Sequence, residues 1–334
     1  MRGIRIPALA TAILAALMLP VSLMTPASAA APTVDVRPLP LPVGERPTVP
    51  YLDRATDDSL SVVDPDTGTT TPVEYVGDPG DSFKLLGRSG SGFVLRGSNR
   101  NIDDIVRVRP GTPQRLLASL HYSSKARLSS DGRYLLDTIP LAGGGIRVQV
   151  RSATTGAGVA QHTFKATTRP DPIDVKGTVV LVGGFNAPRT MVWDWNTGTI
   201  ETIATRAAYA GSYATDRLAT YTMDPSDPDA CTVVSTISAP RTQLWRGCIE
   251  AVASFAPDGA RFATNAIAHQ NHADVVRRRS LHGTLLTTYT NPDGLRTHAW
   301  ETSTRILMSS ASTHEIWLVR CEVADCERAW RAYD

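Results

Sequence analysis

Two series of tight-turn signals alternate along the chain, and their common period restricts the fold more than any other feature of the sequence. The clearest members of the first series are ARLSSDGRYLLDT (126–138) and SFAPDGARFAT (254–264), each with an Asp-Gly pair between two apolar runs. Asp-Gly supplies the positive φ angles that tight hairpins need. The centres of this series lie 39 to 45 residues apart, at Gly92, Gly132, Gly177, Asp216, Gly259 and Thr304.

The second series consists of strand-like segments that end in a Thr-Gly or similar turn, as in MVWDWNTGTIETI (191–203). Its centres lie 42 to 45 residues apart, at Gly68, Gly111, Gly156, Gly198, Pro240, Gly283 and Asp325. Two turns and four strands in each ~42 residues are the period of a β-propeller blade. We therefore predict an all-β chain with a single propeller over residues 51–334, of seven four-stranded blades; six or eight blades stay open as alternatives.

The inner-hairpin segments LSSDGRYLLDT and SFAPDGARFAT resemble those of TolB-like and WD-repeat propellers, whose units carry a Ser-Pro-Asp-Gly-type turn. MVWDWNTGTIETI is similar to the Trp-Asp strand of the same families, although the regular Gly-His pair of WD repeats is missing. The resemblance implies a rigid binding platform and implies no particular reaction. In such a fold, Trp193, Trp300 and Trp317 are expected to pack between blades, with sugar stacking as the alternative.

The first residues have the layout of a cleaved secretory signal. Arg2 and Arg5 precede an apolar run, and small residues at Ala27 and Ala29 close it. We predict a signal peptide over residues 1–29, cleavage after Ala29 and secretion of the mature protein. Residues 30–50 are Pro-rich and predict an extended leader that contributes a first strand. After residue 29 no apolar run is long enough to cross a bilayer, so no membrane span is expected in the mature chain, which we expect to be a monomer.

Charge excludes one class of partner. The formal net charge is +2, and residues of both signs are interspersed, whereas nucleic-acid binders need a basic face. The four cysteines suit an exported protein and form two local pairs. Cys231 and Cys248 flank one outer hairpin and Cys321 and Cys326 flank the last, which predicts two disulfides. A zinc site through all four is disfavoured, because the pairs lie two blades apart.

The longer loops between blades form the face on which we expect a ligand. Histidines and acidic residues of the last two blades map there: His269, His272, Asp274, His298, His314 and Glu315. Imidazole and carboxylate groups that meet in this way can hold a transition metal or act as acid and base, and solvent-exposed loop residues are the alternative. A second acidic group, Asp224, Asp227 and Asp229, offers hard oxygen ligands for calcium, although its prolines equally indicate turns.

No complete catalytic motif is present. Gly90-Ser91-Gly92 is too short for a nucleophile elbow, and the glycines at 143–145 are not followed by a helical pattern. The leading hypothesis is a secreted propeller without cofactor that binds a protein, a peptide or an envelope glycan through its loop face. The alternative is a small secreted propeller enzyme, a metal-assisted lyase or hydrolase that uses the histidine-rich loops.

Overall fold

The computed structural model describes residues 30–56, 59–74, 82–98, 102–121, 125–186, 188–267, 273–312 and 315–332. The chain divides into two compact units, Met1–Ala30 and Ala31–Asp334, and every described strand lies in the second. Apart from one 3-10 turn, η1 (Ala166–Thr168), the regular structure of the described residues is β-strand, which confirms the all-β prediction. In this part of the chain no helix has the length and apolar character required to cross a membrane.

Four sheets each consist of four consecutive antiparallel strands. The second sheet contains β5 (Ser82–Ser89), β6 (Gly92–Ser98), β7 (Ile102–Arg109) and β8 (Thr112–His121). The third contains β9 (Ala126–Leu128), β10 (Tyr134–Pro140), β11 (Gly145–Ser152) and β12 (Gly158–Lys165). The fourth contains β13 (Pro170–Lys176), β14 (Val179–Gly184), β15 (Arg189–Asp194) and β16 (Thr199–Ala204). The fifth contains β17 (Ala207–Ser212), β18 (Arg217–Tyr221), β19 (Thr232–Ser235) and β20 (Trp245–Gly247).

The first and last sheets differ from this plan. The first has three described strands, β2 (Tyr51–Thr56), β3 (Ser59–Asp64) and β4 (Thr69–Val73). The sixth runs through β21 (Glu250–Phe255), β22 (Arg261–Ala266), β23 (Ala273–Ser280), β24 (Leu285–Trp300), β25 (Arg305–Ala311), β26 (Ile316–Glu322) and β27 (Asp325–Ala332). Within the long strand β24, Leu285 and Thr287–Thr290 pair with β23, whereas Leu295–Thr297, Ala299 and Trp300 pair with β25; Leu295 also pairs with Ala273 of β23.

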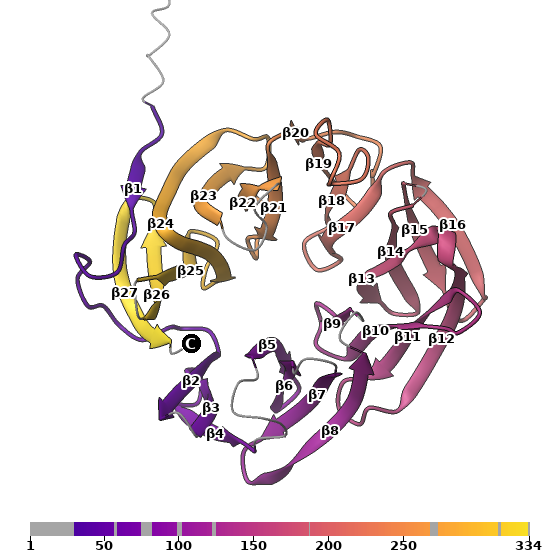
Figure 1. Cartoon of the computed structure of the whole chain (residues 1–334), viewed down its shortest axis with the longest axis horizontal. Coiled ribbons are helices and arrows are strands. Elements are labelled where there is room, and N and C mark those ends of the chain that lie inside the picture. The colour runs from indigo at the N-terminus through magenta and orange to yellow at the C-terminus, as the bar shows by residue number, and fades with distance from the viewer. Residues whose placement is uncertain are drawn as a thin grey trace, which may run out of the picture. The chain divides into compact units, whose positions relative to one another are not determined.

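Within the unit Ala31–Asp334, successive sheets follow one another around a ring, and β5, β9, β13, β17 and β21 lie nearest its centre (Figure 1). Each of these strands begins its sheet, so the sheets radiate outward in chain order. The turns occur where the sequence predicts them. Gly132 and Gly259 adopt φ angles of 69° and 66° between the first two strands of their sheets, which is the left-handed region that glycine enters without a steric penalty.

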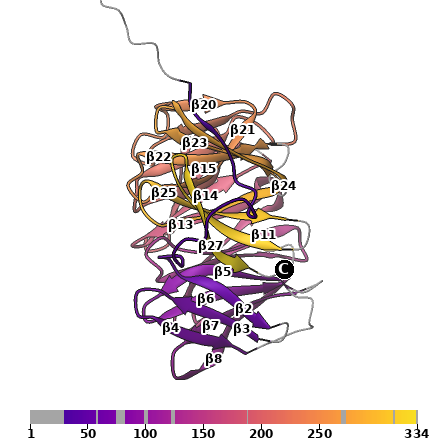
Figure 2. The ribbon, with the colours of Figure 1, turned by 90° about the vertical axis from the view of Figure 1, so that its left-hand side faces the viewer.

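The Pro-rich segment runs along the last sheet. A strand does form, β1 (Thr33–Asp35), but it pairs in parallel with Thr288–Thr290 of β24 instead of joining the first sheet. Further along, Val43 forms a parallel bridge with Arg328 of β27. Figure 2 shows this segment crossing the outside of the last sheet before it enters β2. Proline lacks the N–H that a continuous ladder requires, so the segment is held at separate points along the strand edges.

The core lies between neighbouring sheets. One buried cluster joins Leu136, Val148 and Val150 of the third sheet to Val180 and Trp193 of the fourth. Trp193 and Trp300 are only 2% and 8% exposed, which confirms their predicted packing role. Trp317 is only partly buried against its cluster. Each sheet packs one of its faces against each neighbouring sheet. The ring is therefore stabilised by a series of cores, each formed between two sheets.

Candidate functional site

The predicted histidine-rich site is described only in part. His269, His272 and His314 lie outside the described residues. Asp274 is exposed near the start of β23, and Glu315 directly precedes β26, where it forms an ion pair with Arg331 and accepts a hydrogen bond of 2.9 Å from Trp317 Nε1. No contact between described residues joins these two side chains to one another. Glu315 is thus engaged by its own sheet.

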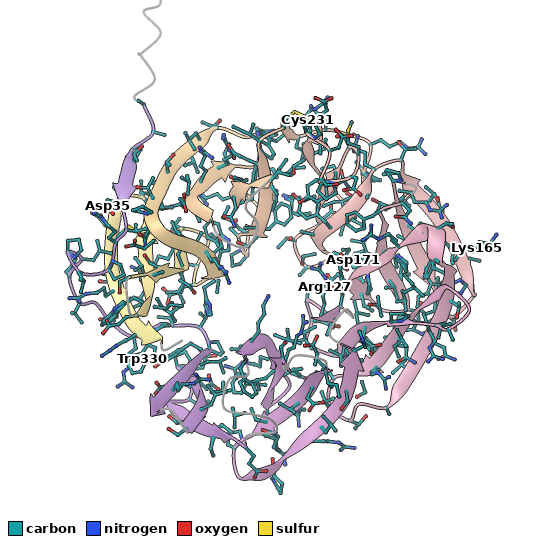
Figure 3. The ribbon with its side chains drawn as sticks, in the orientation of Figure 1. Asp35, Arg127, Lys165, Asp171, Cys231 and Trp330 are labelled. Atoms are coloured by element: carbon teal, nitrogen blue, oxygen red, sulfur yellow. A yellow bond between two sulfur atoms is a disulfide. The ribbon has the colours of Figure 1, made fainter. Side chains whose placement is uncertain are left out.

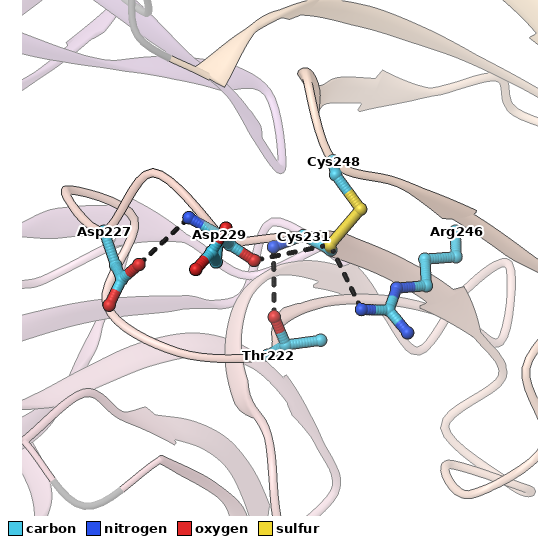
Figure 4. The surroundings of a disulfide bond; sticks show 6 residues. All are labelled: Thr222, Asp227, Asp229, Cys231, Arg246 and Cys248. Carbon is cyan, nitrogen blue, oxygen red and sulfur yellow. Dashed lines mark hydrogen bonds between the residues drawn. A yellow bond between two sulfur atoms is a disulfide. The ribbon is translucent and has the colours of Figure 1, made fainter.

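The three aspartates considered for calcium lie in the loop between β18 and β19, where the side chains of Asp224 and Asp227 organise turns. Asp224 Oδ1 accepts hydrogen bonds from the backbone N–H and the hydroxyl of Ser226, at 2.9 and 2.6 Å. Asp227 Oδ1 accepts one from the backbone N–H of Asp229, at 2.9 Å (Figure 4). The hydrogen bonds from Ser226 lower the pKa of Asp224. Among the described residues, no group of three His, Cys, Asp or Glu side chains is arranged to hold a metal ion.

Both disulfides form as the sequence predicts. Cys231 precedes β19, and Cys248 follows β20, so their bond links the two outer strands of the fifth sheet (Figure 4). Cys321 and Cys326 are directly opposite one another in the antiparallel pair β26–β27. Each bond therefore closes a hairpin on the outside of its sheet, where strand pairing is most exposed to solvent.

His298 differs from the other predicted residues because it lies within β24, in the half that pairs with β25. Its side chain reaches solvent, yet the protein packed around it disfavours the charged form and lowers the pKa to about 4. The ammonium group of Lys84 on β5 acts in the same direction. Strands from two different sheets therefore bring an imidazole and an ammonium group within electrostatic range.

Two guanidinium groups extend this arrangement. Although Lys84 reaches solvent, the protein packed around it is the first cause that lowers its pKa, and the nearby charges of Arg127 on β9 and Arg96 on β6 lower it further. We call Lys84, Arg96, Arg127 and His298 the axial cluster, because β5, β9 and the second half of β24 each begin a group of strands at the inner side of the ring. The sequence interpretation singled out His298 alone.

Buried carboxylates hold the arginines in place. Arg127 Nη2 lies 3.3 Å from the Asp171 carboxylate, which is 2% exposed and also binds Lys125 Nζ at 2.7 Å. Arg127 additionally donates to the backbone oxygen of Tyr209, at 3.2 Å. Figure 3 shows Arg127 and Asp171 together at the inner edge of the ring. Arg96 forms an ion pair with Asp103.

Lys84 is the member without such support. Its side chain is exposed, and within the described part of the chain no carboxylate lies within ion-pair distance of it. The site thus presents one uncompensated ammonium group beside two anchored guanidinium groups and a neutral imidazole. This arrangement favours an anionic group of a ligand.

The pKa of His298 provides a direct test of this geometry. We expect its imidazole to titrate near pH 4 in the native protein and the substitution Lys84→Gln to raise that midpoint, because it removes a repelling charge. Lys176→Gln, at the exposed end of β13, is the matched control. Histidine side-chain NMR signals recorded against pH report the midpoint, and an unchanged value in Lys84→Gln would place the two groups outside electrostatic range.

The same shift sets the sign of a pH effect on stability. The unfolded chain binds this proton near pH 6.5, whereas the native chain binds it only near pH 4. The contribution of His298 therefore makes the native state less stable as the pH falls across that interval.

Comparisons with known proteins bear on the fold. No protein-family model matches the chain, and no protein of curated function matches it either. Among solved structures, Hsv2 of Kluyveromyces lactis is similar at a TM-score of 0.51 and 8% identity, over 88% of this chain and 99% of that one. A structure from a study of two prolyl endopeptidases is similar at a TM-score of 0.52 and 12% identity. The similarity covers 88% of this chain and 52% of that one.

The β-propeller domain of Cps50 (Swd1) from Myceliophteria thermophila is similar at a TM-score of 0.49 and 13% identity, over 75% of this chain and 89% of that one. Sequence identities this low indicate a similar fold and give no evidence of a shared activity. The radial antiparallel sheets have the arrangement of a β-propeller, and the likeness to these solved structures is one of fold alone.

Proposed function

We propose that the chain is an exported, monomeric, seven-bladed β-propeller that binds an anionic group of its ligand at the axial cluster and catalyses no reaction. The count of seven treats β24 as two strands, the outer strand of one blade and the inner strand of the next. Its change of pairing partner, from β23 to β25, supports that division. Export rests on the signal sequence predicted at residues 1–29.

The observation that carries this proposal is the gathering of basic groups from β5, β6, β9 and the second half of β24. The surrounding protein lowers the pKa of Lys84 and of His298 by desolvation first; Arg127 and Arg96 then lower that of Lys84 further, and Lys84 lowers that of His298, so the groups also oppose one another's charged forms. Such repulsion opposes folding, and the surrounding sheets hold the groups in place against it. An anion bound among them would relieve the repulsion, and strongly perturbed groups of this kind concentrate at functional sites.

Carboxylate-bearing ligands suit the site best in an exported protein, as acidic side chains of a protein or peptide or as acidic sugars of an envelope glycan. Guanidinium groups bind carboxylates through paired hydrogen bonds, and the ammonium of Lys84 adds a point charge. Because the cluster reaches solvent, its attraction is expected to weaken as salt rises.

Calorimetric titration of the purified protein with hexaglutamate, and separately with a hexuronate oligosaccharide, tests the proposal. We expect at least one probe to bind, and Lys84→Gln to weaken that binding about tenfold, the size of one charge-assisted hydrogen bond. Lys176→Gln should bind as the unmodified protein does. Equal affinities in both variants, or no binding of either probe, would refute an axial carboxylate site.

The histidine-rich loops are tested on the same preparations. Metal analysis of the protein and of the variant His269→Ala/His272→Ala distinguishes a binding protein from a metal-assisted enzyme. A stoichiometric metal that disappears in the double variant would favour the enzyme and contradict a purely binding role.

A further inference from the structure

A cavity of about 470 Å³ opens on the outside of the ring, between the N-terminal segment, β2 and the last strands of the sixth sheet. The N-terminal segment contributes Val43 and Arg46, and β2 contributes Asp53 and Arg54. Strands β26 and β27 complete the wall with Trp317, Arg328, Trp330 and Arg331. Its volume lies within the range of cavities that hold small organic ligands. Trp330 marks the position in Figure 3, away from the axial cluster.

Two indole rings form the apolar part of this wall, and each has an arginine over it. The guanidinium carbon of Arg46 lies 4.8 Å from the centre of the Trp330 ring. That of Arg328 lies 5.1 Å from the centre of the Trp317 ring. Tyr51 approaches Trp330 as well, with ring centres 5.4 Å apart. A guanidinium group over an indole ring is attracted to the face of that ring, and its N–H groups are the donors that bind carboxylates.

The charge of the wall is unbalanced. Four guanidinium groups and one carboxylate line the cavity, and the carboxylate of Glu315 neutralises Arg331 alone. For Arg46, Arg54 and Arg328, the described residues include no carboxylate within ion-pair distance. A ligand that carries a negative charge would therefore be attracted, and the indole rings would exclude water from the rest of it.

We propose that this cavity binds a small organic carboxylate with an apolar body, held by Arg46 and Arg328 and packed against Trp317 and Trp330. A sugar acid fits less well, because sugars stack on open aromatic faces and here arginines already occupy a face of each indole ring. The N-terminal segment supplies Arg46, so its attachment to β27 through the Val43–Arg328 bridge builds one side of the site.

Calorimetric titration with phenylacetate tests the site, with phenylacetamide as the neutral analogue of the same shape. We expect phenylacetate to bind and phenylacetamide to bind at least tenfold more weakly. Arg46→Gln should weaken phenylacetate binding about tenfold. Arg37→Gln, an exposed arginine of the same segment outside the cavity wall, should leave it unchanged, and so should Lys84→Gln, which separates this site from the axial cluster.

The substitutions at Arg46 and Arg37 both affect exposed side chains, so a folding defect does not obscure the comparison. Equal affinity for phenylacetate and its amide would overturn the proposal, because the arginines would then have no role. Binding of glucuronate in preference to phenylacetate would also overturn it and would indicate a sugar site. Absence of phenylacetate binding would contradict it directly.

Discussion

Replacement of Arg320 by methionine is expected to lower the free energy of unfolding by about 3–5 kcal/mol, because it leaves a buried carboxylate without its cation. The side chain of Arg320 is 6% exposed, and that of its partner Glu301 is fully buried. Arg320 also binds Glu327 Oε1 at 2.5 Å. Methionine fills much of the same space, so the loss arises from charge and not from a cavity.

The ion pairs of Arg320 with Glu301 and Glu327, here called the Arg320 network, matter for stability because they join two segments of the chain. Arg320 donates to the backbone oxygens of Glu45 and Arg46, at 3.2 and 2.7 Å, and Glu301 accepts from the backbone N–H of Thr48 at 2.7 Å. It therefore fastens the N-terminal segment to β26. We expect the variant to loosen residues 45–48 as well as to destabilise the sheet.

Urea unfolding monitored by circular dichroism measures the effect. Arg305→Met is the matched control, because Arg305 pairs with Glu322 on the same sheet and both side chains are nearly half exposed, at 47% and 45%. Exposed pairs of this kind contribute less than about 1 kcal/mol. Similar losses in the two variants would show that burial of the Arg320 network has no special effect.

Phe262→Ala is expected to cost a comparable amount, about 3–5 kcal/mol, through the cavity that it leaves. Phe262 is fully buried in β22, in a cluster with Ala219, Val234 and Val252 from the fifth and sixth sheets. Trp245 packs beside it, with ring centres 5.1 Å apart. Since the cluster joins two sheets, the substitution removes contacts on both sides of a sheet boundary.

Phe255 offers a control within the same hairpin. It is the direct cross-strand partner of Phe262, and its ring centre lies 6.2 Å away, but it is only partly buried. We expect Phe255→Ala to cost less than half as much in the same unfolding experiment. If the order of the two effects were reversed, the assignment of Phe262 to the inter-sheet core would be wrong.

In the structure, the turn centres of the first series also mark a buried position. The third residue after each turn centre of the first series is fully buried, as in Leu135, Val180, Ala219, Phe262 and Leu307. The reason is local: an Asp-Gly turn sets the register of the strand that follows it, and strict alternation then assigns each side chain to a face. The disulfides follow from the same register, because cysteines that are opposite in a hairpin are already within bonding distance.

The candidate sites depend on contacts between units of the repeat, which no local pattern encodes. Lys84 and Arg127 each occur in an ordinary strand, and nothing in either segment shows that the two side chains share one space with His298. The path of the Pro-rich segment was equally hidden, since its partners β24 and β27 lie more than 240 residues away. Its attachment creates the cavity that contains Arg46 and Trp330.

The sequence by itself thus determined the all-β repeat, its hairpins, the buried position after each turn and the two disulfides, because each of these depends on residues close together in the chain. Only the tertiary structure decided which side chains meet at the axis of the ring and what the N-terminal segment covers. Those contacts join residues from different sheets, and their geometry is set by how the sheets pack around the ring.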